Sequence, residues 1–405
     1  MFTEQATEER PVWLSHSSNH RKVTSAGTHR CAPLSATLAR AESVKDILGV
    51  TRVSNLTGLD VIGLPVFQIV APSLNAEPRP GLLTVASGKG ITPEHAKVSA
   101  FMELVERWSA RQHFDDVVVC SSFRALRRTH EAIDPAALTE LGSLGHDEIV
   151  EWTAVREVRT GIRLLCPSSL VFVPTRTPKG FMSPRPGNSN GLAAGNTVTE
   201  ALLHALLELI ERDAKDRCGD VPGASIDLTR LESVPEVADS VARFERAGID
   251  LVVRIVPSLT GVPTMMALSL DRSIAGCRAV CGGLGTHLDP RVALCRAVSE
   301  LVQSRAVFSA GSREDLGLME AAHGDFNLDL ELQRTKGWWV DPNSPVAIDE
   351  IEDLSTDSIL DDLEIVLGRL DQAGFPNAYV ADLTRPAIGI PVVRAIVPGL
   401  RFGGH

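Results

Sequence analysis

Residues 187–214 read GNSNGLAAGNTVTEALLHALLELIERDA, and this stretch decides the fold. It opens with small and polar residues, which favour a loop, and continues with apolar residues over a length that suits a buried helix. We expect this helix over about residues 198–215. The loop is either an ordinary connection or a polar segment that serves a site at the start of the helix.

Two other stretches of the chain resemble this helix. Residues 96–110 read AKVSAFMELVERWSA, residues 201–214 read ALLHALLELIERDA, and residues 293–306 read ALCRAVSELVQSRA. The first two share the pattern Glu-x-x-Glu-Arg, whereas the third has glutamine in place of the second glutamate. Each stretch follows a glycine-rich segment, which predicts an internally repeated unit of strand, glycine loop and helix.

The repeated glutamates point to chemistry. Glu103 and Glu106 are three residues apart, as are Glu208 and Glu211, so each pair shares one face of its helix. Their neighbours are apolar, and carboxylates buried together repel each other and are costly to desolvate. A divalent cation or an arginine would compensate this charge. Two such helices facing each other predict a carboxylate cage suited to Mg²⁺; the alternative is a solvent-exposed stripe of surface ion pairs.

The composition bounds the class of protein. The chain has 405 residues, enough for one large domain or two or three smaller ones, and a formal net charge of −11. Because phosphate neutralisation needs a basic surface, we expect no nucleic-acid partner. Seven cysteines at scattered spacings predict buried thiols rather than a disulfide framework. A polar N-terminus and the lack of a long apolar run predict a cytoplasmic protein without a membrane span.

Helical and strand-like patterns mix along the chain without strict strand–helix–strand alternation, which predicts an α+β fold. Thr92 and Pro93 are typical of a helix cap and a first helical residue. Helices are expected over about residues 35–48, from 93 onward, and over 198–215, 233–247, 290–309 and 356–372. Strands are expected over about residues 61–70, 82–86, 170–173, 251–256, 264–270, 377–382 and 391–397.

The segment Ser87-Gly-Lys-Gly90 does not form a P-loop. A Walker A motif needs Ser or Thr after its lysine, whereas Gly90 stands there, and Leu83 occupies the place of the first glycine. As a glycine turn that opens a helix, the segment could still face an anion. We expect His204 to be a packed, hydrogen-bonded histidine, and Trp338 and Trp339 to serve packing.

Several of these motifs together resemble the signature of the YcaO family. The resemblance rests on Ser189–Thr197 with the helix that follows, on residues 97–107, on the third helix with Gln303 and Arg305 near Arg313, and on residues 389–400. It covers about residues 22–401. It implies a catalytic domain over residues 21–405 that binds ATP without a P-loop. The polar residues 1–20 are expected to form a flexible arm before it.

The YcaO resemblance also implies an activity. Members use ATP and Mg²⁺ to phosphorylate a backbone amide oxygen of a ribosomally made peptide, and the nucleophile decides whether an azoline, a thioamide or an amidine forms. The residues implied as metal ligands are Glu103, Glu106, Glu200, Glu208 and Glu211. The further residues implied as ATP contacts are Lys22, Arg30, Ser99, Asn190, Asn196, Arg212, Gln303 and Arg305.

Two features indicate which subgroup the chain resembles. Azoline-forming members commonly end in a Pro-x-Pro-x-Pro tail, whereas this chain ends in Leu-Arg-Phe-Gly-Gly-His. Residues 27–66 resemble the subgroup that acts beside a TfuA protein, which favours a thioamide product. We therefore expect a precursor peptide and a TfuA-type or leader-binding protein as partners, and a homodimer. The alternatives are an azoline-forming cyclodehydratase, a non-catalytic ATP-binding accessory factor and a carboxylate–amine ligase.

Overall fold

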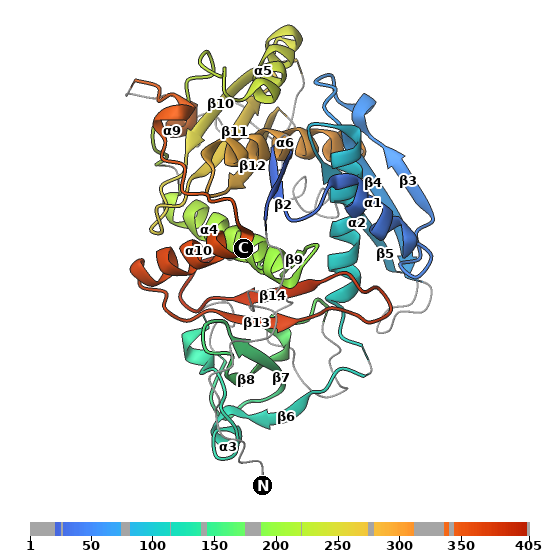
Figure 1. Cartoon of the computed structure of the whole chain (residues 1–405), viewed down its shortest axis with the longest axis vertical. Helices are drawn as coiled ribbons and strands as arrows, with labels where there is room; N and C mark the ends of the chain where they lie inside the picture. Colours follow the sequence, from blue (N-terminus) through green and yellow to red (C-terminus); the bar gives the residue numbers. More distant parts are fainter. Residues whose placement is uncertain are drawn as a thin grey trace.

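The computed structural model describes residues 21–25, 27–73, 82–113, 115–138, 144–174, 188–219, 221–273, 279–311, 336–339 and 344–402. Figure 1 shows two bodies of sheet and helix in the upper part of the molecule and one sheet in the lower part. One long helix, α4 (Val198–Cys218), lies between the upper bodies and the lower sheet. All the strand pairs within the named sheets are antiparallel. This arrangement is an α+β fold.

The N-terminal body contains a three-stranded sheet in the order β3-β4-β5. A short hairpin of β1 and β2 precedes it, and helices α1 and α2 pack together beside the sheet (Figure 1). Thr92 caps α2 by accepting a hydrogen bond from the His95 backbone N–H. The elements are β1 (Val23–Ser25), β2 (Thr28–Arg30), α1 (Leu34–Ser43), β3 (Arg52–Asn55), β4 (Val66–Ser73), β5 (Leu82–Lys89) and α2 (Pro93–Ser109).

The second upper body repeats this plan. Its three-stranded sheet has the order β10-β11-β12, and helix α6 packs against β11 and β12 while α5 packs against β10 and α6. The short helix α9 contacts β10, and Trp338 within it is buried, with Lys215 above its ring. The elements are α5 (Pro235–Ala247), β10 (Asp250–Ile255), β11 (Thr264–Leu270), β12 (Val280–Thr286), α6 (Pro290–Ser309) and α9 (Lys336–Trp339).

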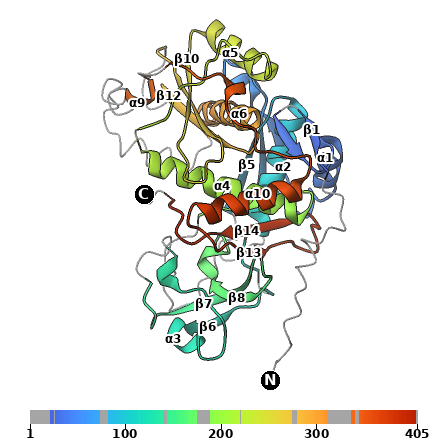
Figure 2. The ribbon, with the colours of Figure 1, turned by 60° about the vertical axis from the view of Figure 1, so that its left-hand side comes forward.

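The lower sheet joins distant parts of the chain. Its strands follow the order β6-β7-β13-β14-β9, and β8 pairs with β7. Helix α4 packs on β14 and β9, and α10 packs on α4, as the turned view in Figure 2 shows. The elements are β6 (Val119–Ser122), α3 (Phe123–Leu126), β7 (Ile149–Glu157), β8 (Arg163–Pro167), β9 (Leu192–Ala194), α10 (Ile359–Gln372), β13 (Tyr379–Asp382) and β14 (Val392–Ile396).

The helices of the sequence analysis are confirmed, and α6 has the predicted bounds. The strand predicted over residues 170–173 is wrong, because residues Ser168–Leu170 form a 3-10 turn after β8. Leu170, Val171 and Phe172 are buried, and a short buried apolar run does not by itself distinguish a strand from other structure. The N-terminal arm of residues 1–20 and Arg313 lie outside the described residues.

Candidate functional site

Three helices follow directly on strands, in the pairs β5–α2, β9–α4 and β12–α6. Two of these units need glycine at a matching place, because the strand lies against the helix backbone. A side chain on Gly88 would collide with Ala96 O and Ala100 N, and one on Gly285 would collide with Ala293 O and Ala297 N. This close approach sets the distance between each strand and the polar face of its helix.

A backbone hydrogen bond orients one glutamate on each of the three helices. Glu103 accepts a hydrogen bond from Ser87 N at 2.9 Å, sixteen residues earlier in the chain. Glu208 accepts one from Gly191 N at 3.3 Å, and Glu300 accepts one from Leu284 N at 3.4 Å. A backbone N–H of the preceding strand or loop thus helps to fix the position of each carboxylate.

The three helices surround one cavity of about 440 Å³. Of the thirteen residues proposed for the site from the sequence, ten line it. They come from β2, from the loop before α4 and from the inward faces of α2, α4 and α6. These ten are Arg30, Ser99, Glu103, Glu106, Asn196, Glu200, Glu208, Glu211, Arg212 and Gln303.

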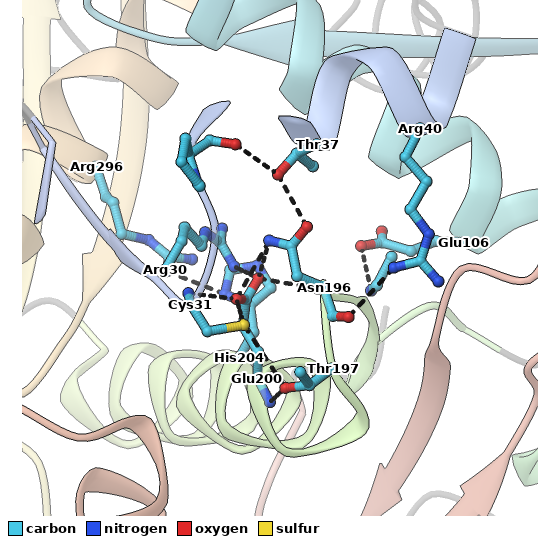
Figure 3. A network of polar contacts seen from close by, with 12 residues as sticks. Arg30, Cys31, Thr37, Arg40, Glu106, Asn196, Thr197, Glu200, His204 and Arg296 are labelled. Atoms are coloured by element: carbon cyan, nitrogen blue, oxygen red, sulfur yellow. Dashed lines mark hydrogen bonds and ion pairs between the residues drawn. The ribbon is translucent and has the colours of Figure 1, made fainter. Parts of the chain in front are cut away.

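Glu200 lies at the centre of the polar network in Figure 3. It accepts hydrogen bonds from Cys31 N at 2.8 Å and from Asn196 Nδ2 at 3.1 Å, and Arg30 approaches its carboxylate to 3.4 Å. Thr37 in turn donates to the Asn196 side-chain oxygen at 2.8 Å. Burial opposes the ionisation of Glu200, but Arg30 and these donors hold its pKa below the usual range.

Glu106 on α2 and Glu208 and Glu211, farther along α4, have the opposite balance. Burial raises the pKa of Glu106 to about 8, although Ala194 N donates a hydrogen bond to it at 2.7 Å. Burial also raises the pKa of Glu208 to about 7, and burial together with the nearby charge of Glu300 raises that of Glu211. Their neighbours therefore do not offset the cost of ionising these three carboxyl groups, and without a further counter-charge burial favours their protonated forms.

The structure does not assemble the single carboxylate cage expected from two facing helices. Among the residues it describes, no three Asp, Glu, His or Cys side chains converge closely enough to hold a metal by themselves. The physical reason is that backbone N–H groups hold the carboxylates on separate parts of the wall. Mg²⁺ needs only one or two protein carboxylates when phosphate oxygens and water complete its shell, so the oxygen donors present still fit this ion.

Three of the proposed residues do not line the cavity. Lys22 is buried in an ion pair with Asp362 at the start of α10. Arg305 is buried between Asp60 and Asp271, at 3.0 Å and 3.1 Å, on the side of α6 away from Gln303 and the cavity. Asn190 belongs to the loop beside the cavity, where its backbone N–H donates to the Asn188 side chain. The carboxylate partners of Lys22 and Arg305, which sequence spacing did not reveal, account for these two placements.

Conversely, the cavity contains residues that were not included in the proposed set. Lys89, from the glycine turn, pairs with Glu300, and Arg296 donates a hydrogen bond to His204 at 3.1 Å. His95 also lines the wall. His204 is hydrogen-bonded, as expected, but it also faces the cavity. The alignment of the third helix with the other two was the signal that could have identified Arg296 and Glu300.

Comparison with known proteins identifies the family. A family model described as YcaO cyclodehydratase, ATP- and Mg²⁺-binding, matches residues 87–401. An uncharacterized protein of Methanothermobacter thermautotrophicus is 35% identical over 362 residues, 87% of this chain and 90% of its own. An uncharacterized protein in the tfuA 3′ region of Rhizobium leguminosarum bv. trifolii is 31% identical over 368 residues, 87% of this chain and 84% of its own.

The fold has a close structural counterpart. The structure of YcaO from Methanopyrus kandleri bound with AMPPCP and Mg²⁺ superposes with a TM-score of 0.74 and 22% identity, covering 94% of this chain and 95% of that one. No helix among the described residues has the length and apolarity to cross a bilayer. The family match spans most of the chain and includes all three cavity helices. The chain therefore belongs to the YcaO family, which binds ATP and Mg²⁺.

Proposed function

We propose that the cavity between α2, α4 and α6 is the site where this protein binds ATP with Mg²⁺, and that it uses the nucleotide to activate a backbone amide of a ribosomally made peptide. The observation that carries the proposal is the convergence of ten of the predicted residues on this cavity. They include Glu106 and Glu208, whose ionisation is opposed by desolvation that raises their pKa values to about 8 and 7. A divalent cation held by these oxygens would supply the missing charge.

The cavity residues divide into two proposed roles. Carboxylates would hold the metal, and polar or cationic side chains would contact the nucleotide. Bound Mg²⁺ would offset the charge of the phosphate oxygens. The metal group is Glu103, Glu106, Glu200, Glu208 and Glu211, and the nucleotide group is Arg30, Ser99, Asn196, Arg212 and Gln303. Asn190, beside this site, stays in the second group, whereas Lys22 and Arg305 would stabilise the surrounding structure.

We propose a thioamide as the product. A sulfide nucleophile adds to the amide carbon, the γ-phosphoryl group of ATP is transferred to the amide oxygen, and that oxygen leaves with the phosphate. The products are the thioamide, ADP and phosphate, and inorganic sulfide supplies the sulfur. Since little covalent work falls to the protein in such a transfer, its side chains mainly position the reactants and offset charge.

The sulfur chemistry and the partner rest on one relative. The Rhizobium protein lies in a tfuA 3′ region and aligns over most of this chain. We therefore propose a TfuA-type protein as the partner that presents sulfide or the peptide leader. We also propose that residues 21–405 form one catalytic domain and that the protein works as a homodimer.

A second candidate is azoline formation. It is favoured by the description of the matching family model as a cyclodehydratase. In this reaction the nucleophile is a Cys or Ser side chain of the peptide itself, so the product loses one water molecule and needs no sulfide. The two candidates share the nucleotide site and differ only in the nucleophile.

The experiment combines the purified protein, Mg–ATP, a candidate precursor peptide and a TfuA-type protein, with and without sulfide. The proposal predicts ADP release that requires the peptide, and a peptide that exchanges one oxygen for one sulfur only when sulfide is present. A peptide that loses water without sulfide would support the azoline instead. Nucleotide binding without turnover of any peptide would support an accessory role, and turnover of a free amino acid with a carboxylate would indicate a ligase.

A further inference from the structure

The cations of the cavity differ in how their charges are compensated. Four of them pair with a carboxylate of the cavity wall within 4.0 Å, and these are Arg30, Lys89, Arg107 and Arg212. Arg296 is the exception. Within the part of the chain that the structure describes, its one polar contact is the hydrogen bond to His204 Nδ1 at 3.1 Å. The guanidinium group of Arg296 is poorly solvated, and this desolvation lowers its pKa.

The contact with His204 defines the state of that histidine. A guanidinium group has five N–H donors and no acceptor, so Nδ1 of His204 must accept the hydrogen bond. The imidazole is therefore neutral and carries its proton on Nε2. Burial and the positive charge of Arg296 both lower the pKa of His204 well below its ordinary value, which agrees with this neutral form. A neutral partner orients Arg296 without forming an ion pair with it, and Glu208, Glu211 and Glu300 act on its charge only from beyond ion-pair distance.

The position of Arg296 in the chain supports a role in the site. Ser99, His204 and Arg296 each lie four residues before the glutamate that the preceding strand or loop orients, and all three line the cavity. One helical turn separates each of them from its glutamate, so they form a second ring beside the carboxylates. Arg296 is the cationic member of this ring.

We propose that Arg296, oriented by His204, binds the phosphate oxygens of the nucleotide. This inference rests on the proposed nucleotide site and extends it to a residue outside the predicted set. An anion with several oxygens would use the donors that His204 leaves unpaired and would compensate the charge of this half-buried guanidinium group. His204 is then a positioning residue, because it acts through Arg296.

The test is a calorimetric titration with the Mg complex of a non-hydrolysable ATP analogue, with adenosine measured as a competitor. Arg296→Met should weaken the analogue by about 10- to 100-fold, as expected for losing hydrogen bonds to a charged group, and should leave adenosine unchanged. Arg291→Met is the matched control, since Arg291 lies on the same helix but pairs with Asp289 and Asp353 outside the cavity. It should bind the analogue as the wild type does.

His204 is tested by combining substitutions. His204→Leu should weaken analogue binding in the wild type but add nothing in the Arg296→Met background, whereas His204→Gln, which retains an acceptor, should restore part of the loss. The inference would be overturned if Arg296→Met bound the analogue as strongly as the wild type, or if it lost adenosine binding equally. Loss of analogue binding in Glu208→Gln would show, in the same experiment, that the proposed nucleotide site itself still holds. Failure of the wild type to bind the analogue with Mg²⁺ would overturn the proposed site as well.

Discussion

Helices α4 and α6 each carry a glutamate at the equivalent position, Glu208 and Glu300, but the surroundings shift the pKa values of the two in opposite directions. On α4, burial raises the pKa of Glu208 to about 7, and its nearest cation is Arg212 at 3.7 Å. On α6, burial also opposes the charge of Glu300, but the direct partner Lys89 and the nearby Arg212 lower its pKa. The same backbone geometry thus holds one carboxylate whose distant cation is shared with Glu211 and one that has a direct partner in Lys89.

This difference indicates a division of labour within the cavity. The α2 and α4 wall contains the carboxyl groups of Glu106 and Glu208, whose ionisation burial opposes and a metal ion would favour, whereas the α6 wall contributes Arg296, a cation without an ion pair among the described residues. A nucleotide with its metal has both signs of charge. It would fit between the walls with phosphate oxygens toward α6 and the metal toward α2 and α4.

The largest expected effect is the loss of the α4 carboxylate. Glu208→Gln should lower the release of ADP from Mg–ATP by more than about 100-fold, because it removes a proposed metal ligand while keeping the shape of the side chain. Circular dichroism and the melting temperature should stay close to those of the wild type. Wild-type turnover in both Glu208→Gln and Glu211→Gln would remove α4 from the metal site.

The next effect concerns stability rather than binding. Asp60→Ala should destabilise the protein by about 3 kcal/mol, because it leaves the guanidinium of Arg305 buried with only one of its two carboxylate partners. Urea denaturation measures this loss. Nucleotide affinity of the folded variant should change little. A stable Asp60→Ala protein with weakened nucleotide binding would instead place Arg305 in the ATP site.

The raised pKa values predict how stability depends on pH. Glu106 and Glu208 keep protons up to about pH 8 and 7 when folded, whereas the unfolded chain releases them near 4.5. The folded protein binds more protons in this window, so the stability contributed by the neutral forms is present at low pH and is lost as pH rises through these values. The melting temperature without nucleotide should fall as the pH rises from about 4.5 to about 8, relative to that of a Glu106→Gln, Glu208→Gln variant, and should level off above pH 8.

Saturating Mg–nucleotide supplies the control for this pH effect. Bound metal favours the ionised carboxylates, so it should stabilise the protein more strongly at high pH than at low pH. An equal gain at every pH would show that these two carboxylates do not meet the metal.

The smallest effect is expected at the α6 glutamate. Glu300→Gln should lower turnover by no more than about 10-fold, since Lys89 already compensates the charge of Glu300 and the loss is that of a supporting contact. Steady-state measurement of ADP release in parallel with Glu208→Gln gives the comparison. Equal losses in the two variants would show that α4 and α6 serve the metal alike.

Much of the site could be predicted from the sequence because helical spacing fixes which residues share a face. Glu103, Glu106, Glu208 and Glu211 line one cavity for this reason. The separation of the carboxylates could not be predicted, since it depends on backbone N–H groups such as Ala194 N, which have no signature in the side chains. The equivalence of the three helices as a sequence repeat stays a prediction, supported by their matched contacts.

The errors of the sequence-based prediction have a common cause. Arg305 matches a motif, but its partner Asp60 lies 245 positions away in the chain, and such a contact follows from tertiary packing alone. The strand β7 was also missed, although it forms the middle of the lower sheet between β6, β8 and β13. Local sequence patterns therefore predicted the helices and their polar faces. Which charged side chains face the cavity depends instead on ion-pair partners that are distant in the sequence.

The central claim is that the cavity binds nucleotide through a metal held by the carboxylates of α2 and α4. The most direct test is a calorimetric titration of the wild type and the Glu106→Gln, Glu208→Gln variant with a non-hydrolysable ATP analogue, in Mg²⁺ and in EDTA. We predict saturable binding by the wild type that requires Mg²⁺ and is lost in the variant. Binding that persists in EDTA, or that the variant retains in full, would contradict the claim.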